Sequence, residues 1–175
     1  MKPTKLIYLF VLILCGCSST ETYDIIIKNG IIIDGSGNAS YLGDVGINAD
    51  TIAAVGNLNA KGNIEIDAAG LVVAPGFINM LSWATESLIE DGKSQGDIRQ
   101  GVTLEVFGEG WSMGPLTEEV KKQSQEDQDD IKYKIEWTSL AEYLQFLVDK
   151  GISPNVASFV GATTLRINTV GFEDR

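Results

Sequence analysis

Histidine is absent from this 175-residue chain, and cysteine occurs only at Cys15 and Cys17. Imidazole is the commonest metal ligand and the usual proton carrier near neutral pH, so the chain lacks the side chain on which many catalytic sites depend. A serine–histidine triad within the chain is excluded, including one built on Ser112. Because no cysteine follows Cys17, neither a disulfide framework nor a cysteine-based metal knuckle can form in the rest of the chain.

Basic residues are scarce as well. The chain has 13 Lys and Arg against 24 Asp and Glu, a formal net charge of −11, and no basic run outside its first five residues. A body with this charge repels phosphate backbones, so we do not expect nucleic acid as a partner. The composition, 44% hydrophobic and 21% charged, is otherwise typical of a globular domain.

The first seventeen residues have the pattern of a secretory signal peptide. Lys2 and Lys5 precede an apolar run over residues 6–14, which is too short for a transmembrane helix because such a helix needs ~20 apolar residues. Small residues and the two cysteines follow this run. Segment 1–17 therefore predicts that the protein is exported.

The end of this signal, Leu14-Cys15-Gly16-Cys17, is similar to the cleavage box of bacterial lipoproteins. The resemblance implies that cleavage occurs before Cys17 and that the sulfur of this residue carries lipid, which anchors the protein to a membrane. Because Ser18 rather than an aspartate follows, it also implies the outer membrane, with the protein facing the periplasm. The alternative is an ordinary signal peptide whose two cysteines have no role.

Residues 22–76 have the pattern of short β-strands separated by Gly, Asn and Asp. The dipeptide Asn29-Gly30 is a strong hairpin signal, so we expect strands at 24–28 and 31–34 to pair across it. Further strands are expected at 44–48, 51–55, 63–67 and 71–73. Segments at this spacing predict a sandwich or a partial barrel, without a helix before Pro75.

Residues 77–175 alternate between helical and strand patterns. We expect helix within 85–100 and strands at 102–107 and 156–160. Between the strands, a capping box of Ser139 and Glu142 begins an amphipathic helix that ends at Gly151. Its apolar face is expected to contain Leu140, Tyr143, Leu144, Leu147 and Val148. The order strand, helix, strand predicts a parallel α/β sheet.

The segment over residues 115–137 is polar and acidic. Asp127, Asp129 and Asp130 resemble part of a calcium loop, but the glycine and the terminal glutamate of such a loop are missing. We therefore expect a solvated run of charge in this segment.

Several segments together resemble the N-acyl-D-amino-acid deacylases, a branch of the metal-dependent amidohydrolases. These are Tyr23–Gly30 with Asp34-Gly35-Ser36-Gly37, Val73–Ile78, Gln100-Gly101-Val102-Thr103, Asn155-Val156-Ala157 and Val160-Gly161. Each piece is a weak motif by itself. Their order and spacing are specific, and the similarity covers most of residues 23–171.

The resemblance implies an α/β fold with a β-sandwich. Residues 22–76 would form part of a composite β-sandwich domain, and residues 77–175 would form the first units of a (β/α)8 barrel of the TIM type. A complete barrel needs ~250 residues. We therefore expect the chain to be the truncated N-terminal fragment of a longer protein, inactive by itself.

The chain departs from this family at the residues that carry the chemistry. After the Pro-Gly-Phe-Ile segment the family usually has Asp-x-His-x-His, whose histidines bind a metal. Here Leu81 and Trp83 stand at the two histidine positions, and neither side chain can bind a metal ion. A family cysteine in the loop after the next strand is replaced by Gly108-Glu109-Gly110, and a histidine further along is replaced by Ala162.

Glu109 is the candidate metal ligand of this chain. It follows the expected strand at 102–107, at the position where the loops of a barrel build active sites. The glycines on either side of it would let the backbone approach a ligand closely. The alternative is a solvated loop glutamate. Trp83 and Trp111 are expected to be packing residues or pocket walls.

In function, the resemblance implies a hydrolase of non-peptide carbon–nitrogen bonds that deacylates N-acyl amino acids or similar small amides. Its cofactor would be a divalent metal, zinc, that activates water. Its partners would be the small-molecule amide substrate and the membrane that holds the N-terminal lipid. One alternative is a metal-free binding or scaffold lipoprotein with a degenerate barrel, and another is a complete small structural lipoprotein.

Overall fold

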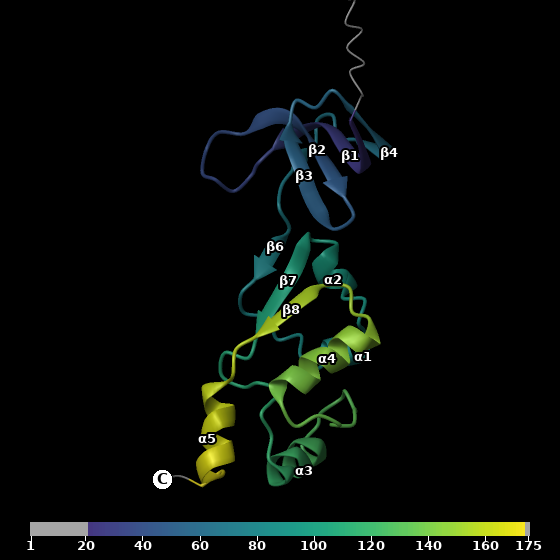
Figure 1. The fold of residues 1–175 in the computed structure, drawn as a ribbon. Coiled ribbons are helices and arrows are strands. Elements are labelled where there is room, and N and C mark those ends of the chain that lie inside the picture. Colours follow the sequence, from purple (N-terminus) through teal and green to yellow (C-terminus); the bar gives the residue numbers. More distant parts are fainter. Residues whose placement is uncertain (1–20, 174–175) are drawn as a thin grey trace, which may run out of the picture. The chain divides into compact units, whose positions relative to one another are not determined.

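The computed structural model describes residues 21–173, which divide into two compact units at the boundary between Pro75 and Gly76. Each unit has its own sheet and its own core (Figure 1). The signal segment and Cys17 lie outside the described residues, so lipid attachment stays a prediction. Between residues 21 and 173, no helix is long and apolar enough to cross a bilayer.

The first unit is a sheet with strand order β3-β2-β1-β4, in which β5 also pairs with β1. Its strands are β1 (Glu21–Ile32), β2 (Tyr41–Asn48), β3 (Thr51–Gly56), β4 (Ala60–Asp67) and β5 (Val72–Val73). Strands β1, β2 and β3 pair antiparallel, whereas β4 and β5 pair parallel to β1. The strands expected at 44–48, 51–55, 63–67 and 71–73 are all present. No helix occurs between residues 21 and 75.

The expected hairpin at Asn29-Gly30 is wrong. Strand β1 runs straight through this dipeptide, and its register against β2 shifts between Ile27 and Gly30, which is a β-bulge. Asn29 adopts the positive φ of 61° that the sequence signal requires, but it uses this conformation for the bulge. Its backbone N–H donates to Asp44 Oδ1 at 2.9 Å, and its side-chain amide donates to Asp67 Oδ1 at 3.0 Å.

A small core lies on one face of this sheet. Tyr23 and Ile26 of β1 are almost fully buried and contact Ala60. The ring of Tyr23 lies across Gly46 of β2, where an added Cβ would be only 2.7 Å from Tyr23 Cε2. Glycine at this position therefore provides the space for the largest buried side chain of the unit.

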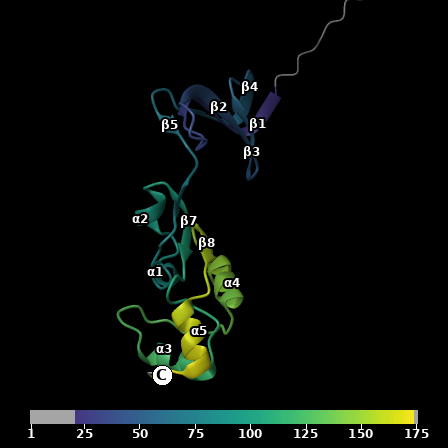
Figure 2. The same cartoon turned by 90° about the vertical axis from the view of Figure 1, so that its left-hand side faces the viewer.

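The second unit contains a parallel sheet with strand order β6-β7-β8. Its strands are β6 (Phe77–Asn79), β7 (Val102–Phe107) and β8 (Asn155–Ser158), and its helices are α1 (Ser87–Glu90), α2 (Gln95–Ile98), α3 (Glu118–Glu126), α4 (Leu140–Lys150) and α5 (Ala162–Val170). Helices α1 and α2 connect β6 to β7, α3 and α4 connect β7 to β8, and α5 follows β8. Helix α4 packs alongside β8 (Figure 2). The predicted parallel α/β arrangement is confirmed for these three strands.

The core of the second unit lies between the sheet and its helices. Tyr143 and Leu147 of α4 are 0% exposed. The ring of Trp137 lies 5.0 Å from that of Tyr143, and the ring of Phe107 lies 6.2 Å from that of Tyr143, measured between ring centroids. Tyr143 O–H donates to the carbonyl of Thr85 at 2.8 Å, which gives the buried hydroxyl a partner.

Helix α4 has the predicted limits and the predicted caps. The Ser139 hydroxyl accepts from the backbone N–H of Glu142, and Gly151 ends the helix with a φ of 78°. Val148 is an exception on the predicted face, because it is 62% exposed. Residues 85–100 contain two four-residue helices, so the helix expected within this range is confirmed. Helices α3 and α5 were not predicted.

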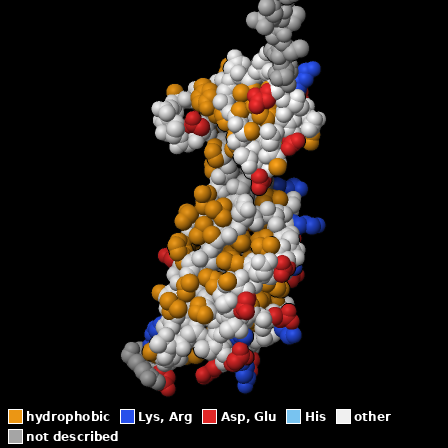
Figure 3. Space-filling model, viewed as in Figure 1, with side chains coloured by type: hydrophobic (Ala, Val, Ile, Leu, Met, Phe, Trp, Pro, Cys, Tyr) orange, Lys and Arg blue, Asp and Glu red, His pale blue; other side chains and the backbone are white. Residues whose placement is uncertain are grey.

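Neither a closed barrel nor a pair of facing sheets is present between residues 21 and 173. Residues 21–75 form one sheet rather than two facing sheets, and residues 76–173 form a three-stranded sheet that is not closed. Figure 3 shows hydrophobic side chains gathered over β6, β7 and β8 on the visible face of the second unit. The exposed apolar residues in and directly after β6 and β8 include Phe77, Ile78, Met80, Phe159 and Val160. An exposed surface of this kind is typical of a site that contacts other protein.

Candidate functional site

A pocket of about 260 Å³ lies in the second unit, at the carboxyl ends of β6 and β7. We call it the strand-end pocket. Its walls come from the loop after β6, the loop after β7, helix α3 with the segment that follows it, and helix α5. The lining residues on which the argument depends are Leu81, Trp83, Glu86, Glu109, Trp111, Met113, Asp127 and Tyr133. In parallel α/β folds, ligands bind at this end of the strands.

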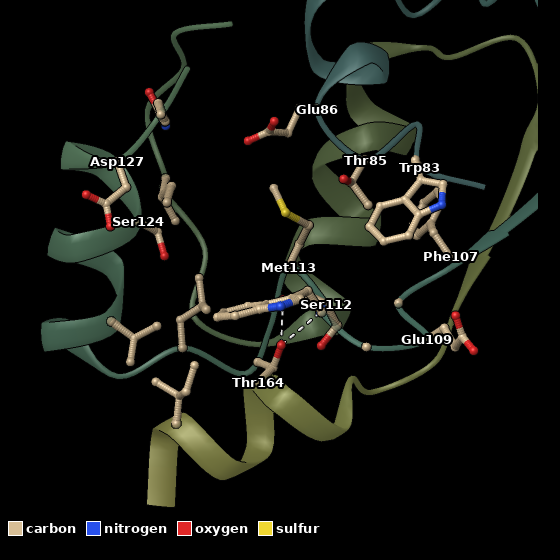
Figure 4. Close-up of a pocket in the computed structure, with 18 of the residues that line it drawn as sticks. Trp83, Thr85, Glu86, Phe107, Glu109, Ser112, Met113, Ser124, Asp127 and Thr164 are labelled. Carbon is tan, nitrogen blue, oxygen red and sulfur yellow. Dashed lines mark hydrogen bonds between the residues drawn. The ribbon is translucent and has the colours of Figure 1, made fainter. Parts of the chain in front are cut away.

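Buried polar contacts join the loop after β7 to the start of α5. Ser112 Oγ donates to the carbonyl of Gly114 at 2.6 Å and accepts from the N–H of Gly161 at 2.9 Å. The N–H of Ser112 donates to Thr164 Oγ1 at 2.8 Å, a bond that Figure 4 shows. Both side chains are buried. They hold two loops together and have the roles of structural residues.

The glycines beside Glu109 have a different role from the one expected. An added Cβ at Gly108 would lie 2.3 Å from the carbonyl oxygen of Phe159, and Gly108 has a φ of 88°. Gly108 therefore permits close contact between the loops after β7 and β8 rather than close approach of a ligand. A Cβ at Gly110 would meet no atom within 4 Å, so a larger side chain would also fit at this position.

Glu105 is a buried carboxylate that the sequence did not single out. It lies on β7 and is 0% exposed. Ser82 Oγ donates to its Oε2 at 2.6 Å, and Ser94 Oγ lies 3.1 Å from its Oε1. None of the ion pairs formed by residues 21–173 involves Glu105, so two hydroxyls are its recorded partners.

The Glu105 contacts hold the loop after β6 in place. Ser82 lies in this loop between Leu81 and Trp83, and its backbone N–H donates to the carbonyl of Val106 at 2.9 Å. The Ser82 hydroxyl also accepts from the N–H of Ala84 at 3.1 Å. With Ser82 fixed inward, its two neighbours are directed to the pocket surface, where Leu81 is 53% and Trp83 78% exposed.

A tyrosine–glutamate pair forms another part of the strand-end pocket. Tyr133 O–H donates to Glu86 Oε1 at 2.7 Å. Burial, and then this bond to the carboxylate, raise the pKa of Tyr133 above its ordinary value. The Tyr133 ring is stacked on that of Trp137, with an interplanar angle of 7°. These contacts fix the position of the Glu86 carboxylate.

Glu109, the predicted metal ligand, lines the strand-end pocket and is exposed. Its carboxylate points away from the side chains of Ser112 and Met113 (Figure 4). In the part of the chain that the structure describes, no group of three or more His, Cys, Asp or Glu could hold a metal ion. Glu109 is thus an isolated donor here, and its role as a ligand stays a prediction.

The expected pocket walls and the solvent exposure of the acidic run are both confirmed. Trp83 and Trp111 both line the strand-end pocket. The segment over 115–137 also contains helix α3, and Asp127 and Asp129 contribute to the pocket wall. Both aspartates are nevertheless exposed.

No family model matches the chain. Among curated proteins, D-aminoacylase of Alcaligenes xylosoxydans xylosoxydans is 34% identical over 151 residues, which are 85% of this chain and 31% of that protein. N-acyl-D-aspartate deacylase of the same organism is 31% identical over 148 residues, 82% of this chain and 29% of that protein. The chain therefore spans about a third of the length of the curated relatives that it matches.

Solved structures give the same result. A D-aminoacylase structure, studied for its binuclear metal centre, superposes with a TM-score of 0.72 at 34% identity and covers 83% of this chain and 31% of that one. The N-acyl-D-glutamate deacylase of Bordetella bronchiseptica, complexed with zinc and a phosphonate inhibitor, superposes with a TM-score of 0.71 at 28% identity, covering 85% and 31%. The chain is homologous to D-aminoacylase-like amidohydrolases over most of its length, as the sequence motifs predicted. Its sheets match the N-terminal part of D-aminoacylase structures.

Proposed function

We propose that the complete protein hydrolyses non-peptide carbon–nitrogen bonds and deacylates N-acyl amino acids or similar small amides. The observation that carries this proposal is the similarity to D-aminoacylase, which extends over 85% of the chain in sequence. A D-aminoacylase structure superposes on 83% of the chain with a TM-score of 0.72. The place of the strand-end pocket supports the proposal, because the carboxyl ends of such strands are where barrel enzymes bind their substrates.

The described residues do not fit a metal centre by themselves. A catalytic zinc needs about three protein ligands, whereas Glu109 is an isolated donor in the strand-end pocket. Leu81 and Trp83 present only hydrocarbon and indole at the positions where the family motif has histidines. These residues therefore contribute pocket walls, and no catalytic step through a metal can be assigned to them.

We retain Glu109 as the candidate contribution of this segment to a metal site in the complete protein. Glu109→Ala should lower the bound metal and the turnover together without changing the melting profile in chelator. The test is elemental analysis beside activity on a panel of N-acyl amino acids. Glu118→Ala, a change on the exposed surface of α3, is the matched control. Wild-type metal content and rate in Glu109→Ala would show that Glu109 is only a loop residue.

A second candidate function is a metal-free binding or scaffold protein that retains the pocket. The observation that favours it is the apolar pair Leu81 and Trp83 in the pocket wall. A complete protein that binds small ligands but contains no metal and cleaves no amide would support this alternative.

We also propose that the protein is an exported lipoprotein of the outer membrane, facing the periplasm. This proposal depends on the sequence around Cys17, which lies outside residues 21–173. Cys17→Ser should leave an uncleaved precursor that incorporates no labelled fatty acid, whereas Cys15→Ser should mature normally. Normal labelling of the Cys17→Ser variant would contradict lipid attachment, and fractionation to the inner membrane would contradict only the location.

A further inference from the structure

We propose that the strand-end pocket is the subsite for the acyl group of the substrate, and that it takes medium-length or aromatic acyl groups rather than formyl or acetyl groups. The assignment rests on the proposed function, because it places one end of an N-acyl amino acid in this pocket. The other end, which carries the carboxylate, lies outside it. The floor of the pocket, its opening and its volume support this orientation and this class of acyl group.

The floor of the pocket is hydrocarbon that belongs to the core of the second unit. Five apolar side chains that line the pocket are each at most 9% exposed: Phe107, Leu116, Val120, Ile135 and Ile167. Hydrophobic and aromatic linings of this kind are typical of small-molecule sites. An apolar chain that reaches this floor leaves water, and each methylene that becomes fully buried strengthens binding about fourfold.

The buried polar side chains of the pocket already have partners within the protein. The hydroxyl of Thr164 accepts from the N–H of Ser112 at 2.8 Å, and the hydroxyl of Ser82 donates to Glu105 at 2.6 Å. Among residues 21–173, no buried side-chain nitrogen or oxygen lacks a hydrogen-bond partner. A carboxylate at this floor would lose its water without gaining a free donor, which is costly. The end of the substrate that enters is therefore the apolar one.

The charges of the pocket agree with this orientation. Its charged lining residues are all acidic: Glu86, Glu109, Asp127 and Asp129. They disfavour a carboxylate inside the pocket and leave the entry of an uncharged acyl group unaffected. These acids determine only the direction of the substrate, whereas the apolar floor and walls provide the binding.

Large apolar side chains also line the pocket where it opens to solvent. Leu81 is 53%, Trp83 78% and Trp111 53% exposed, and all three line the same cavity. Exposed apolar surface that is gathered in this way is typical of a binding site. Leu81 and Trp83 lie on either side of Ser82, which the buried Glu105 holds in place. This wall is therefore in position before a ligand arrives, which reduces the entropy lost on binding.

The volume of the pocket indicates the size of the acyl group. The cavity has about 260 Å³ (Figure 4), whereas a cavity of about 150 Å³ lined by Leu, Ile and Phe is sufficient for benzene. A phenyl group or an alkyl chain of similar size fits into this space. The methyl of an acetyl group would leave most of it unfilled, so that the apolar lining would lack contact partners.

The test uses methyl ketones as probes, because they present a carbonyl and an acyl chain but have neither a charge nor an amide bond. These are 2-butanone, 2-heptanone and 4-phenylbutan-2-one, titrated into the complete protein at pH 7 by calorimetry. We expect the two larger ketones to bind at least tenfold more tightly than 2-butanone. The three additional methylenes of 2-heptanone would give roughly 60-fold if all of them were fully buried. In hydrolysis, kcat/KM should likewise be higher for N-hexanoyl-D-leucine than for N-acetyl-D-leucine.

Matched variants place the binding of the longer chain in this pocket. Leu81→Asn keeps a side chain of similar size but makes this wall polar, and it should remove most of the preference for 2-heptanone over 2-butanone. Trp83→Ala should reduce the same preference. Leu165→Asn, the same change at an exposed leucine of α5 outside the pocket, should leave it unchanged. Because all three residues are exposed, none of these changes removes a buried side chain.

The acyl subsite is contradicted if 2-butanone binds as tightly as the larger ketones, or if no ketone binds. It is also contradicted if Leu81→Asn and Trp83→Ala both keep the full preference for the longer chain. Because no ketone contains an amide, these outcomes are independent of hydrolysis. A protein that binds the larger ketones in this pocket but cleaves no amide retains the apolar subsite and contradicts the proposed function, whereas an active hydrolase that prefers N-acetyl substrates does the reverse.

Discussion

The contact between Ser82 and Glu105 gives a sharp prediction about the loop after β6. Ser82→Ala removes the 2.6 Å hydrogen bond to the Glu105 carboxylate and the acceptor for the N–H of Ala84. The backbone bond from Ser82 to Val106 survives the change. The variant therefore loses the side-chain contacts that fix the loop, while the loop keeps its backbone hydrogen bond to β7.

The size of the effect follows from the burial of the carboxylate. Glu105 is 0% exposed, and its other hydroxyl partner, Ser94, also lies 3.0 Å from Asp97 Oδ2, so that one proton is shared between two carboxylates. Loss of a hydrogen bond to a buried charge costs about 2 kcal/mol, which corresponds to a roughly 30-fold larger population of the locally open state. We expect Glu105→Gln to cost less, because its amide can still accept from one serine.

Hydrogen–deuterium exchange of the complete protein measures this opening in peptides that cover residues 80–86 and 102–107. Exchange in these peptides should accelerate in Ser82→Ala and remain unchanged in Ser87→Ala, a change at an exposed position of α1. Wild-type exchange rates in both peptides of Ser82→Ala would refute the argument that Glu105 holds the loop through Ser82.

Three further results are expected. Gly161→Ala should destabilise the second unit by about 3 kcal/mol, since its Cβ would lie 2.5 Å from the carbonyl oxygen of Gly110; Gly96→Ala, which meets no atom within 4 Å, should be tolerated in the same thermal melt. Burial raises the pKa of Tyr143 above its ordinary value of 10.0, so the folded state favours the neutral phenol. The contribution of this group to stability should therefore be full below pH 10 and decline as the pH rises further. In denaturation series at successive pH values, Tyr143→Phe should reduce this decline. Ser139→Ala should cost about 1 kcal/mol in urea denaturation through loss of the cap of α4, and an unchanged midpoint would show that the cap contributes nothing.

Local signals in the sequence were sufficient for some elements. Helix α4 could be predicted because its capping box, its apolar face and its terminal glycine all lie within residues 139–151. Helix α3 has one buried residue, Val120, and therefore gives no apolar period to detect. Helix α5 begins at Ala162, and its N-cap residue is Gly161, which has no side chain to cap the helix, so its start carries no polar capping signal.

Contacts between distant residues could not be predicted. The sequence predicted a turn at Asn29-Gly30, but whether this dipeptide makes a turn or a bulge depends on β2, β4 and β5, which pair with both halves of β1. Glu105 is a single charge in a strand pattern, and its importance becomes visible only when Ser82, 23 residues away, is placed beside it. The pocket acids likewise come from the segments just before α1 and just after α3 and from the loop after β7, which only the tertiary structure brings together.

The most direct test of the central proposal is the release of free amino groups from a panel of N-acyl-D-amino acids and related small amides by the purified complete protein. The account predicts release above the buffer blank for at least one amide of the panel, with turnover that Trp83→Ala reduces because the pocket wall is lost. No release from any member of the panel by a folded protein that still binds small ligands in the strand-end pocket would contradict the hydrolase proposal and favour the binding protein.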